Sequence, residues 1–395
     1  MTQTTSVRLA EPAHEMAREE IRKQAAFLSC EISNPRFNDD GSVLEYDAPE
    51  GAPDALAGRV EALARRVQRS LRGLRRKVVY RSLAADRPRF LGGGSGFSGV
   101  TATGEGQVAL EGLPLALYRY FDRTFESFGD PWLARPILTP TLIPSAVLSK
   151  CDYFRSFPQN VTFACHLIED SERIEGFRAR HHERDELDDR TLSDLATPEV
   201  CLSPAVCYHV YNLNRGRTIP EGGLAYGVCG RCFRYESSNL GGLNRLWDFT
   251  MREVVFLGSR DDVLARREAS IRQMADFLES HELAGEIRTA SDPFFIAPDA
   301  PGKTYFQLSS ETKYEVSLML PDGDRLAVGS HNYHTDFFGR AFDVGVEGAG
   351  AMHSVCVAFG LERWVCAFLA QHGEDPGRWP EPVRSAPEIA GGGRR

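Results

Sequence analysis

The chain has 395 residues, a formal net charge of −9 and 42% hydrophobic residues. This length allows one large domain with an appendage or two to three domains, and the hydrophobic fraction supports a substantial buried core. The negative charge excludes a surface that attracts nucleic acid everywhere, so an anionic partner would need a local basic patch. No apolar run approaches the roughly 20 residues of a membrane span and no signal peptide is evident, which predicts a cytoplasmic protein without a membrane partner.

The first 107 residues predict a small α+β domain followed by a Gly-rich linker. Residues 1–14 are polar and predict a frayed end, and residues 15–28 predict a helix. Apolar residues recur at three- and four-residue steps through residues 54–76, which predicts a second helix. The other face of that helix is basic and carries Arg59, Arg65, Arg66, Arg69, Arg72, Arg75 and Arg76. Residues 77–81 predict a strand of this domain, and the glycines of residues 92–96 mark the linker.

Residues 108–375 predict a second, larger domain with grouped strands. We expect strands over residues 200–211, 226–235, 249–258, 314–320 and 326–331, with a charged helix over residues 260–281. Grouped strands favour an antiparallel sheet flanked by helices over the alternating strands and helices of a parallel sheet. Residues 169–190 are dense in charge and predict a surface loop, and the Pro- and Gly-rich residues 376–395 predict a disordered tail.

The segment from Cys232 to Glu253 predicts a strand, a loop and a returning strand that carry nucleotide-binding groups. Arg234 and Glu236 alternate with aromatic residues, so we expect them to share one face of a strand. Arg245 and Phe249 follow in the loop and the returning strand. A guanidinium binds phosphate, a flat ring stacks on a base and a carboxylate fixes orientation. A solvated Arg–Glu pair on a surface strand is the alternative interpretation of the first two residues.

Three segments together resemble the motifs of class II aminoacyl-tRNA synthetases. The Arg234-x-Glu236 pair, the loop and Phe249 resemble motif 2, residues 359–363 (Phe-Gly-Leu-Glu-Arg) resemble motif 3, and residues 116–140 are similar to motif 1. The resemblance covers about residues 110–375 and implies an α+β fold with an antiparallel sheet flanked by helices, in a homodimer. It implies catalytic roles for Arg234, Glu236 and Arg363. It also implies that ATP is bound by Arg234, Glu236, Arg245, Phe249, Ser330, Glu362 and Arg363.

Cys207, Glu253 and Cys356 resemble the metal ligands of a zinc-dependent subgroup, the atypical seryl-tRNA synthetases and the related amino acid:[carrier protein] ligases. Three ligands from separated segments leave a fourth position open, which is the arrangement of a catalytic zinc, and that position takes the substrate's amino group in the subgroup. The cysteine spacing allows an alternative. Cys229-x-x-Cys232 could join Cys201 and Cys207 in a structural four-cysteine zinc site.

Residues 330–339 are similar to the strand that helps bind magnesium and substrate in the seryl enzymes, with Ser330 at the matching serine. Ala327 occupies the position of the usual magnesium-binding glutamate, so Glu315 and Glu347 are the candidates to replace it. The resemblance therefore implies ATP, Mg²⁺ and Zn²⁺ as cofactors.

The resemblance implies two half-reactions. A small amino acid, glycine or alanine with serine as another candidate, is activated by ATP as the aminoacyl-adenylate and then passes to the phosphopantetheine thiol of a carrier protein. Residues 152–159 and 248–256, together with the lack of a long two-helix arm, favour this reading over a tRNA synthetase. The alternatives are an atypical seryl-tRNA synthetase-like enzyme that charges tRNA, and a catalytically silent synthetase paralogue. The basic helix of residues 59–76 suits either tRNA or an acidic carrier protein, and the helix of residues 260–281 is a second candidate for carrier docking.

Overall fold

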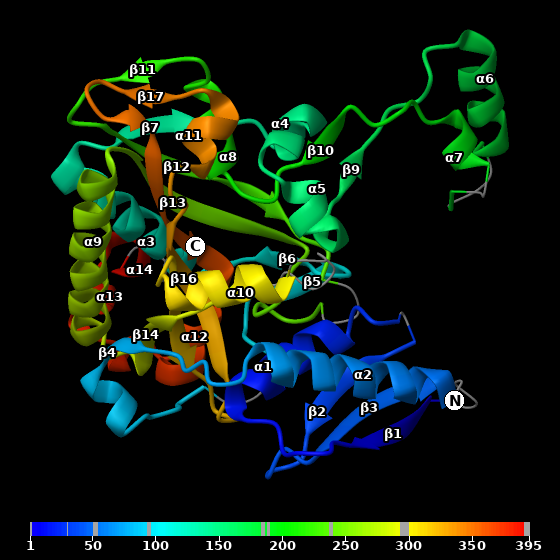
Figure 1. The fold of residues 1–395 in the computed structure, drawn as a ribbon, viewed down its shortest axis with the longest axis horizontal. Helices are drawn as coiled ribbons and strands as arrows, with labels where there is room; N and C mark the ends of the chain where they lie inside the picture. Colours follow the sequence, from blue (N-terminus) through cyan, green and yellow to red (C-terminus); the bar gives the residue numbers. More distant parts are fainter. Residues whose placement is uncertain are drawn as a thin grey trace.

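The structure, a computed structural model, describes residues 2–29, 31–49, 54–92, 96–182, 186–187, 190–236, 240–292 and 300–390. Its centre is an eight-stranded sheet with strand order β4-β14-β15-β16-β19-β13-β12-β7 (Figure 1). These strands are β4 (Val78–Arg81), β7 (Arg135–Leu138), β12 (Leu224–Phe233), β13 (Asp248–Gly258), β14 (Gly285–Thr289), β15 (Lys313–Met319), β16 (Arg325–Tyr333) and β19 (His353–Gly360). Only the β12–β7 pair is parallel among them, so the predicted antiparallel α+β fold is confirmed.

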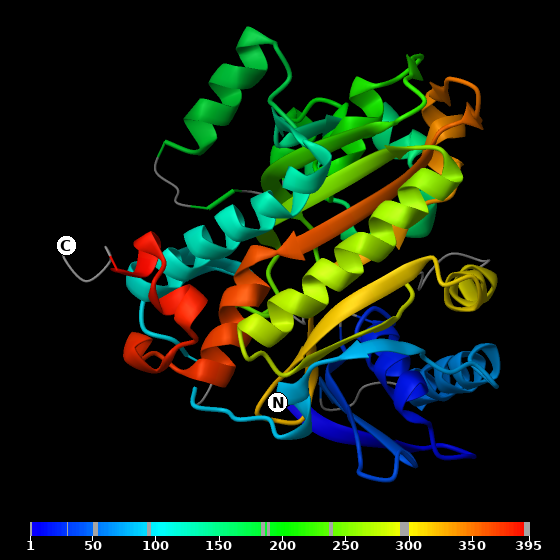
Figure 2. The ribbon, with the colours of Figure 1, turned by 90° about the vertical axis from the view of Figure 1, so that its left-hand side faces the viewer.

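Three helices cover one face of this sheet, namely α3 (Gly112–Glu126), α9 (Arg260–Ser280) and α12 (Leu361–His372) (Figure 2). Alternation along β13 sends Val254 and Phe256 into this layer, and both are fully buried there. The ring of Phe125 on α3 stacks on Phe359 with the centroids 4.2 Å apart. This apolar layer fixes the start of α12 against the middle strands of the sheet.

The opposite face is covered by the short helices α4 (Ser145–Lys150), α5 (Tyr153–Ser156), α8 (Cys207–Leu213) and α11 (Phe337–Phe342). A small sheet of β8 (Leu142–Pro144), β10 (Val200–Leu202) and β9 (Phe163–Ala164) lies beside them. An arm with α6 (Ser171–Arg180) and α7 (Thr191–Asp194) extends from β9 and β10 (Figure 1). The segment predicted as a charged loop over residues 169–190 therefore contains a helix, α6.

The N-terminal domain has its own three-stranded sheet of β1 (Thr2–Arg8), β3 (Val43–Pro49) and β2 (Ser33–Phe37). Helices α1 (Glu15–Ala25) and α2 (Asp54–Ser70) pack on it around a separate core. The frayed end predicted for residues 1–14 is wrong over β1, which pairs along its whole length with β3.

The strand predicted over residues 77–81 does not join the N-terminal sheet. It is β4, the edge strand of the central sheet, where Tyr80 pairs with Ile287. The hairpin of β5 (Val100–Gly104) and β6 (Gln107–Leu110) also lies with the larger domain, because the Trp247 amide donates to the Gly106 carbonyl at 2.9 Å. The boundary between the two domains therefore precedes the Gly-rich linker, where it was predicted. Residues 93–95 of that linker lie outside the described residues.

The predicted disordered tail over residues 376–395 is wrong as far as Ala390. The segment forms α13 (Glu381–Arg384) and α14 (Pro387–Ala390), and the side chains of Trp379, Val383 and Ile389 are buried in the core beside α3 and α12. The Trp379 indole donates to the Gly373 carbonyl at 2.9 Å. Residues 391–395 lie outside the described residues.

The remaining elements are α10 (Ala300–Ser309), which leads into β15, and a small sheet of β11 (Thr218–Ile219), β17 (Gly345–Val346) and β18 (Gly350–Ala351). Within the described ranges, no helix has both the length and the apolar character that crossing a membrane requires.

Candidate active site

The sheet face under α8 carries part of the candidate site in two adjacent rows of side chains that run across four strands. The register of the strands gives the first row as Glu315, Ser330, Ala358 and Glu253. The second row is Lys313, Asn332, Cys356 and Val255. Residues opposite each other on paired strands lie about 5 Å apart at Cβ, so two predicted metal ligands, Glu253 and Cys356, share one continuous floor with Ser330.

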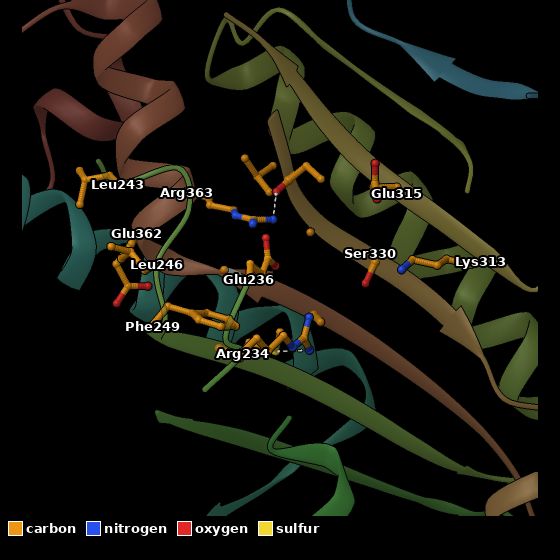
Figure 3. A pocket seen from close by; sticks show the side chains of 16 residues that line it. Arg234, Glu236, Leu243, Leu246, Phe249, Lys313, Glu315, Ser330, Glu362 and Arg363 are labelled. Atoms are coloured by element: carbon orange, nitrogen blue, oxygen red, sulfur yellow. Dashed lines mark hydrogen bonds between the residues drawn. The ribbon is translucent and has the colours of Figure 1, made fainter. Parts of the chain in front are cut away.

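A cavity opens over Glu315, Ser330 and Ala358 of the first row (Figure 3). Predicted site residues from four segments line it, namely Arg234, Glu236, Phe249, Ser330, Glu362 and Arg363. Arg245 lies beside it through an ion pair with Glu236, with 3.3 Å between Nε and Oε2. The structure thus gathers side chains that are separated by up to 129 positions in the sequence.

Arg234 follows the end of β12 at Phe233, so it lies just beyond the strand rather than within it as predicted. Its Nε donates to the Pro204 carbonyl at 2.9 Å, and its guanidinium lies 5.6 Å from the centroid of the Phe249 ring. A backbone acceptor and an aromatic ring hold the group without neutralising its charge. That charge remains for an anion in the cavity.

Arg363, on the first turn of α12, is the second cation of the cavity. Its Nε donates to the Asn244 carbonyl at 2.9 Å and its Nη1 to the Ala327 carbonyl at 3.1 Å. Burial lowers the pKa of the Arg363 guanidinium, Glu236 opposes this shift, and the charges of Arg245 and Arg234 add to it. An anionic ligand between these arginines would relieve their mutual repulsion.

Glu362 lines the cavity, but its carboxylate already accepts hydrogen bonds from another residue of the protein. Its carboxylate accepts the Thr250 amide at 2.9 Å and the Thr250 hydroxyl at 3.0 Å, and its side chain is buried. It therefore ties β13 to the start of α12. These bonds fit a residue that positions the neighbouring Arg363, and the ATP contact implied by the resemblance stays a prediction.

Cys207, Glu253 and Cys356 converge at the other end of the floor. All three are buried, and their ligand atoms lie within 4.8 Å of one another. Cys207 was predicted on a strand and instead begins α8, which lies across the sheet. The Cys356 thiol donates to Glu253 Oε2 at 2.8 Å. Burial raises the pKa of the Glu253 carboxyl, although hydrogen bonds from Cys356 and Cys207 oppose this shift.

These three side chains fit a zinc ion. Zinc binds thiolate sulfur at about 2.3 Å and carboxylate oxygen at about 2.0–2.2 Å, so tetrahedral ligands are separated by roughly 3.5–4 Å. The three ligand atoms lie within 4.8 Å of one another, and the 2.8 Å between Cys356 Sγ and Glu253 Oε2 would lengthen when an ion replaces the thiol proton. Burial raises the pKa of the Cys356 thiol well above its usual range, and a bound cation supplies the charge that ionises such a thiol.

The alternative four-cysteine site does not form. Cys229 and Cys232 are three residues apart on β12, so their side chains point to opposite faces of the sheet. Cys229 packs against the core on the α3 side of the sheet, near Asp122, and Cys232 is buried in the core on the opposite face. Among the described residues, the Cys207, Glu253 and Cys356 group is the only cluster with the spacing of a metal site.

Of the two carboxylates predicted to replace the glutamate at position 327, only Glu315 lines the cavity. Glu347 follows β17, where its amide donates to the Ile219 carbonyl at 3.0 Å.

Sequence reasoning missed Lys313, which lines the cavity and forms an ion pair with Asp292. The signal was available, because residues two apart on a strand share a face and Lys313 precedes Glu315 by two.

Comparison with known proteins identifies the family. Residues 191–372 match the family described as tRNA synthetase class II core domain (G, H, P, S and T). An amino acid--[acyl-carrier-protein] ligase 1 from Bradyrhizobium diazoefficiens is 34% identical over 259 residues, which cover 64% of this chain and 77% of the relative. The chain belongs to this class II synthetase-like ligase family. A ligase 2 from the same organism is 35% identical over 248 residues, covering 62% of this chain and 72% of the relative.

The ligase family is also similar to tRNA enzymes. A Type-2 serine--tRNA ligase from Methanopyrus kandleri is 29% identical over 262 residues, which cover 63% of this chain but only 50% of that protein. A crystal structure of M. kandleri SerRS in complex with A. aeolicus tRNASec superposes with a TM-score of 0.67 at 22% identity, over 97% of this chain and 77% of that one. At that identity the likeness establishes the fold alone.

Proposed function

We propose that this protein activates a small amino acid with ATP and transfers it to the phosphopantetheine thiol of a carrier protein. The observation that carries the proposal is the buried Cys207, Glu253 and Cys356 cluster on the same sheet face as the arginine-lined cavity. A ligase needs an amino-acid site beside an ATP site, and the position of the cluster next to the cavity supports this assignment. The two amino acid--[acyl-carrier-protein] ligases at 34% and 35% identity support the carrier protein as acceptor.

In the first half-reaction, an oxygen of the amino acid carboxylate attacks the α-phosphorus of ATP and pyrophosphate leaves. The carboxylate is already ionised, so no general base is needed. Arg234 holds the α-phosphate and the carboxylate, Arg363 holds the γ-phosphate, and Phe249 stacks on the adenine. Glu236 orients Arg245 through their ion pair. Glu315 and Ser330 face each other across β15 and β16 and are the candidate ligands of Mg²⁺. Catalysis is positioning plus charge stabilisation.

Cys207, Glu253 and Cys356 would hold zinc. When bound, the ion supplies an open Lewis-acid position that accepts a neutral amine. An amino acid is then recognised through its amino group, without contacts to its side chain. The chain's own contribution is the buried, preassembled ligand set. Ala358 separates this set from Ser330 along the floor and leaves room for a small substrate.

In the second half-reaction, the phosphopantetheine sulfur attacks the carbonyl carbon of the adenylate. The bond from that carbon to the phosphate oxygen breaks, AMP leaves, and the thiol proton passes to solvent. The product is a thioester on the carrier. This step needs the carrier to reach the cavity, but no further catalytic group.

We also propose a homodimer in which β7 lies at the interface. This edge strand leaves Leu138 95% exposed, and Leu133 just before it is 88% exposed. An unpaired strand edge with large apolar side chains favours association with another chain. Sedimentation at micromolar concentration tests this, with Leu138→Lys expected to shift the protein towards monomer.

Charging of tRNA is the second candidate, favoured by the Type-2 serine--tRNA ligases and by the basic helix α2. One experiment separates the candidates. Amino-acid-dependent exchange of labelled pyrophosphate into ATP is measured first across an amino acid panel, because a silent paralogue would show none. The active amino acid is then offered with total tRNA and, separately, with holo and apo acyl carrier proteins. We expect label on the holo carrier only.

A further inference from the structure

The N-terminal domain carries a concentrated positive charge that the activation chemistry does not use. Residues 59–77 contain eight basic residues and one acidic residue, whereas residues 1–50 contain five basic and ten acidic residues. We call the exposed arginines on and just after α2 the α2 stripe. They are Arg59, Arg65, Arg66, Arg69, Arg72 and Arg75. The opposite side of α2, with Val60, Leu63 and Val67, is buried in the N-terminal core.

Five of the six arginines of the α2 stripe have no carboxylate partner among the described residues. Arg59 donates to the Leu28 carbonyl, and Arg65 forms an ion pair with Glu61 at 3.5 Å. No carboxylate of the described residues lies within 4 Å of Arg69, Arg72 or Arg75. Exposed arginines whose charge is not balanced locally raise the local potential and attract an acidic surface.

Helix α10 connects the stripe to the active site. It packs against α2, and its Leu308 is buried in the N-terminal core (Figure 1, Figure 2). On its other side, the Lys303 ammonium lies 3.1 Å from Asp152 and 2.9 Å from the Ser156 hydroxyl of α5. The chain then runs from α10 into β15, whose Lys313 and Glu315 line the cavity.

The outer face of α10 is apolar where a partner would reach it. Tyr305 is 57% exposed and Phe306 is 51% exposed. Exposed aromatic residues and arginines are the residue types enriched in binding hot spots. We call the α2 stripe together with Tyr305 and Phe306 the docking ridge.

We infer that the docking ridge binds an acidic carrier protein while its phosphopantetheine arm enters the cavity. This inference rests on the proposed function and adds the surface and the charge of the partner. The basic surface is one face of α2 and the turn that follows it, in a domain whose residues 1–50 are acidic, on a chain of net charge −9. Such a confined stripe fits one acidic helix of a compact protein better than the long phosphate backbone of RNA, which the surrounding negative charge would repel.

The test is the triple substitution Arg69→Glu, Arg72→Glu and Arg75→Glu. The acceptor is the holo acyl carrier protein that the wild-type protein loads best, and free pantetheine serves as an acceptor without a protein surface. We expect the KM for the holo carrier to rise about tenfold or more. Pyrophosphate exchange and transfer to pantetheine should stay within twofold of wild type, which shows that the variant is folded and active.

Two further variants make the result specific. Arg260→Glu with Arg272→Glu on α9 reverses exposed charge on the other candidate helix and should leave the carrier KM unchanged. Tyr305→Ala should raise that KM without a change of charge. A carrier KM within twofold of wild type in the triple variant overturns the docking ridge alone. Failure of the wild type to load any holo carrier overturns the proposed function itself, and a triple variant that loses only tRNA charging assigns the ridge to RNA and overturns the inference.

Discussion

The active-site floor and the docking ridge use charge in opposite ways. On the floor, Arg234 and Arg363 are half-buried and held by backbone carbonyls, and Glu253 is buried between two cysteines. On the ridge, the arginines are exposed and Arg69, Arg72 and Arg75 lie on or beyond the last turn of α2. Fixed charges in a concave site suit chemistry, where geometry decides the rate. Mobile surface charges suit encounter with a partner, where they decide affinity and association rate.

We expect substitutions on the active-site floor to lower the rate of adenylate formation, whichever acceptor is used. Arg234→Ala should lower the rate of amino-acid-dependent pyrophosphate exchange about 1,000-fold, because it removes a preorganised donor to the reacting phosphate. Arg234→Lys should recover only part of this loss, since lysine lacks the planar fork. Arg272→Ala on the exposed face of α9 is the control. An Arg234→Ala variant with near-normal exchange would contradict the assignment.

The metal cluster gives the second largest effect. Cys356→Ala or Cys207→Ala should abolish stoichiometric zinc and lower pyrophosphate exchange at least about 100-fold. Elemental analysis of the purified protein checks the metal. Cys366→Ala on α12 is the matched control and should retain zinc. Zinc that remains after either ligand is removed would exclude this cluster as its site.

Glu362 should give a smaller effect, since we place it in a supporting role. Glu362→Gln replaces an acceptor of the Thr250 amide with a group that also donates, which should lower the free energy of unfolding by about 2 kcal/mol. The exchange rate should fall only about tenfold. Urea unfolding and exchange assays measure both, with the exposed Glu105→Gln as control. A loss as large as that of Arg234→Ala, with unchanged stability, would instead favour a direct ATP contact.

A buried histidine outside both regions should affect stability and not chemistry. His281 donates from Nδ1 to the Phe277 carbonyl and accepts the Tyr120 hydroxyl at Nε2, and burial lowers its pKa to about 4. The unfolded chain, with an ordinary histidine pKa near 6.5, binds the proton more readily between these values. The contribution of His281 to the free energy of unfolding should therefore fall as the pH drops below about 6.5, by up to roughly 3 kcal/mol at pH 4.

The measurement is the urea midpoint as a function of pH. His281→Gln should flatten this part of the profile relative to wild type. An unchanged slope would show that His281 does not remain neutral in the folded protein.

Sequence reasoning succeeded where a pattern is long or a motif is specific. The helix predicted over residues 260–281 is α9, and the strand predicted over residues 249–258 is β13, each within a residue of its observed ends. The family was also identified correctly from the motif 2 and motif 3 residues. These features depend on local periodicity and on the residues themselves.

The sequence-based predictions were wrong where contacts between distant parts of the chain determine the structure. Cys207 begins a helix although a short apolar run fits a strand equally well. Residues 78–81 join the central sheet through pairing with β14, more than 200 positions away. The Pro- and Gly-rich composition of residues 376–390 predicted disorder, although the segment contains Trp379, Val383 and Ile389. These residues become core residues only because α3 and α12 provide the surface that they cover.

The most direct test of the central claim is the chemistry of the loaded acceptor. The protein is incubated with ATP, magnesium, a labelled small amino acid and an equimolar mixture of holo carrier, apo carrier and total tRNA. If the amino acid passes to the phosphopantetheine thiol, we expect label on the holo carrier alone, as a thioester that neutral hydroxylamine releases. Label on tRNA with none on the holo carrier would contradict it.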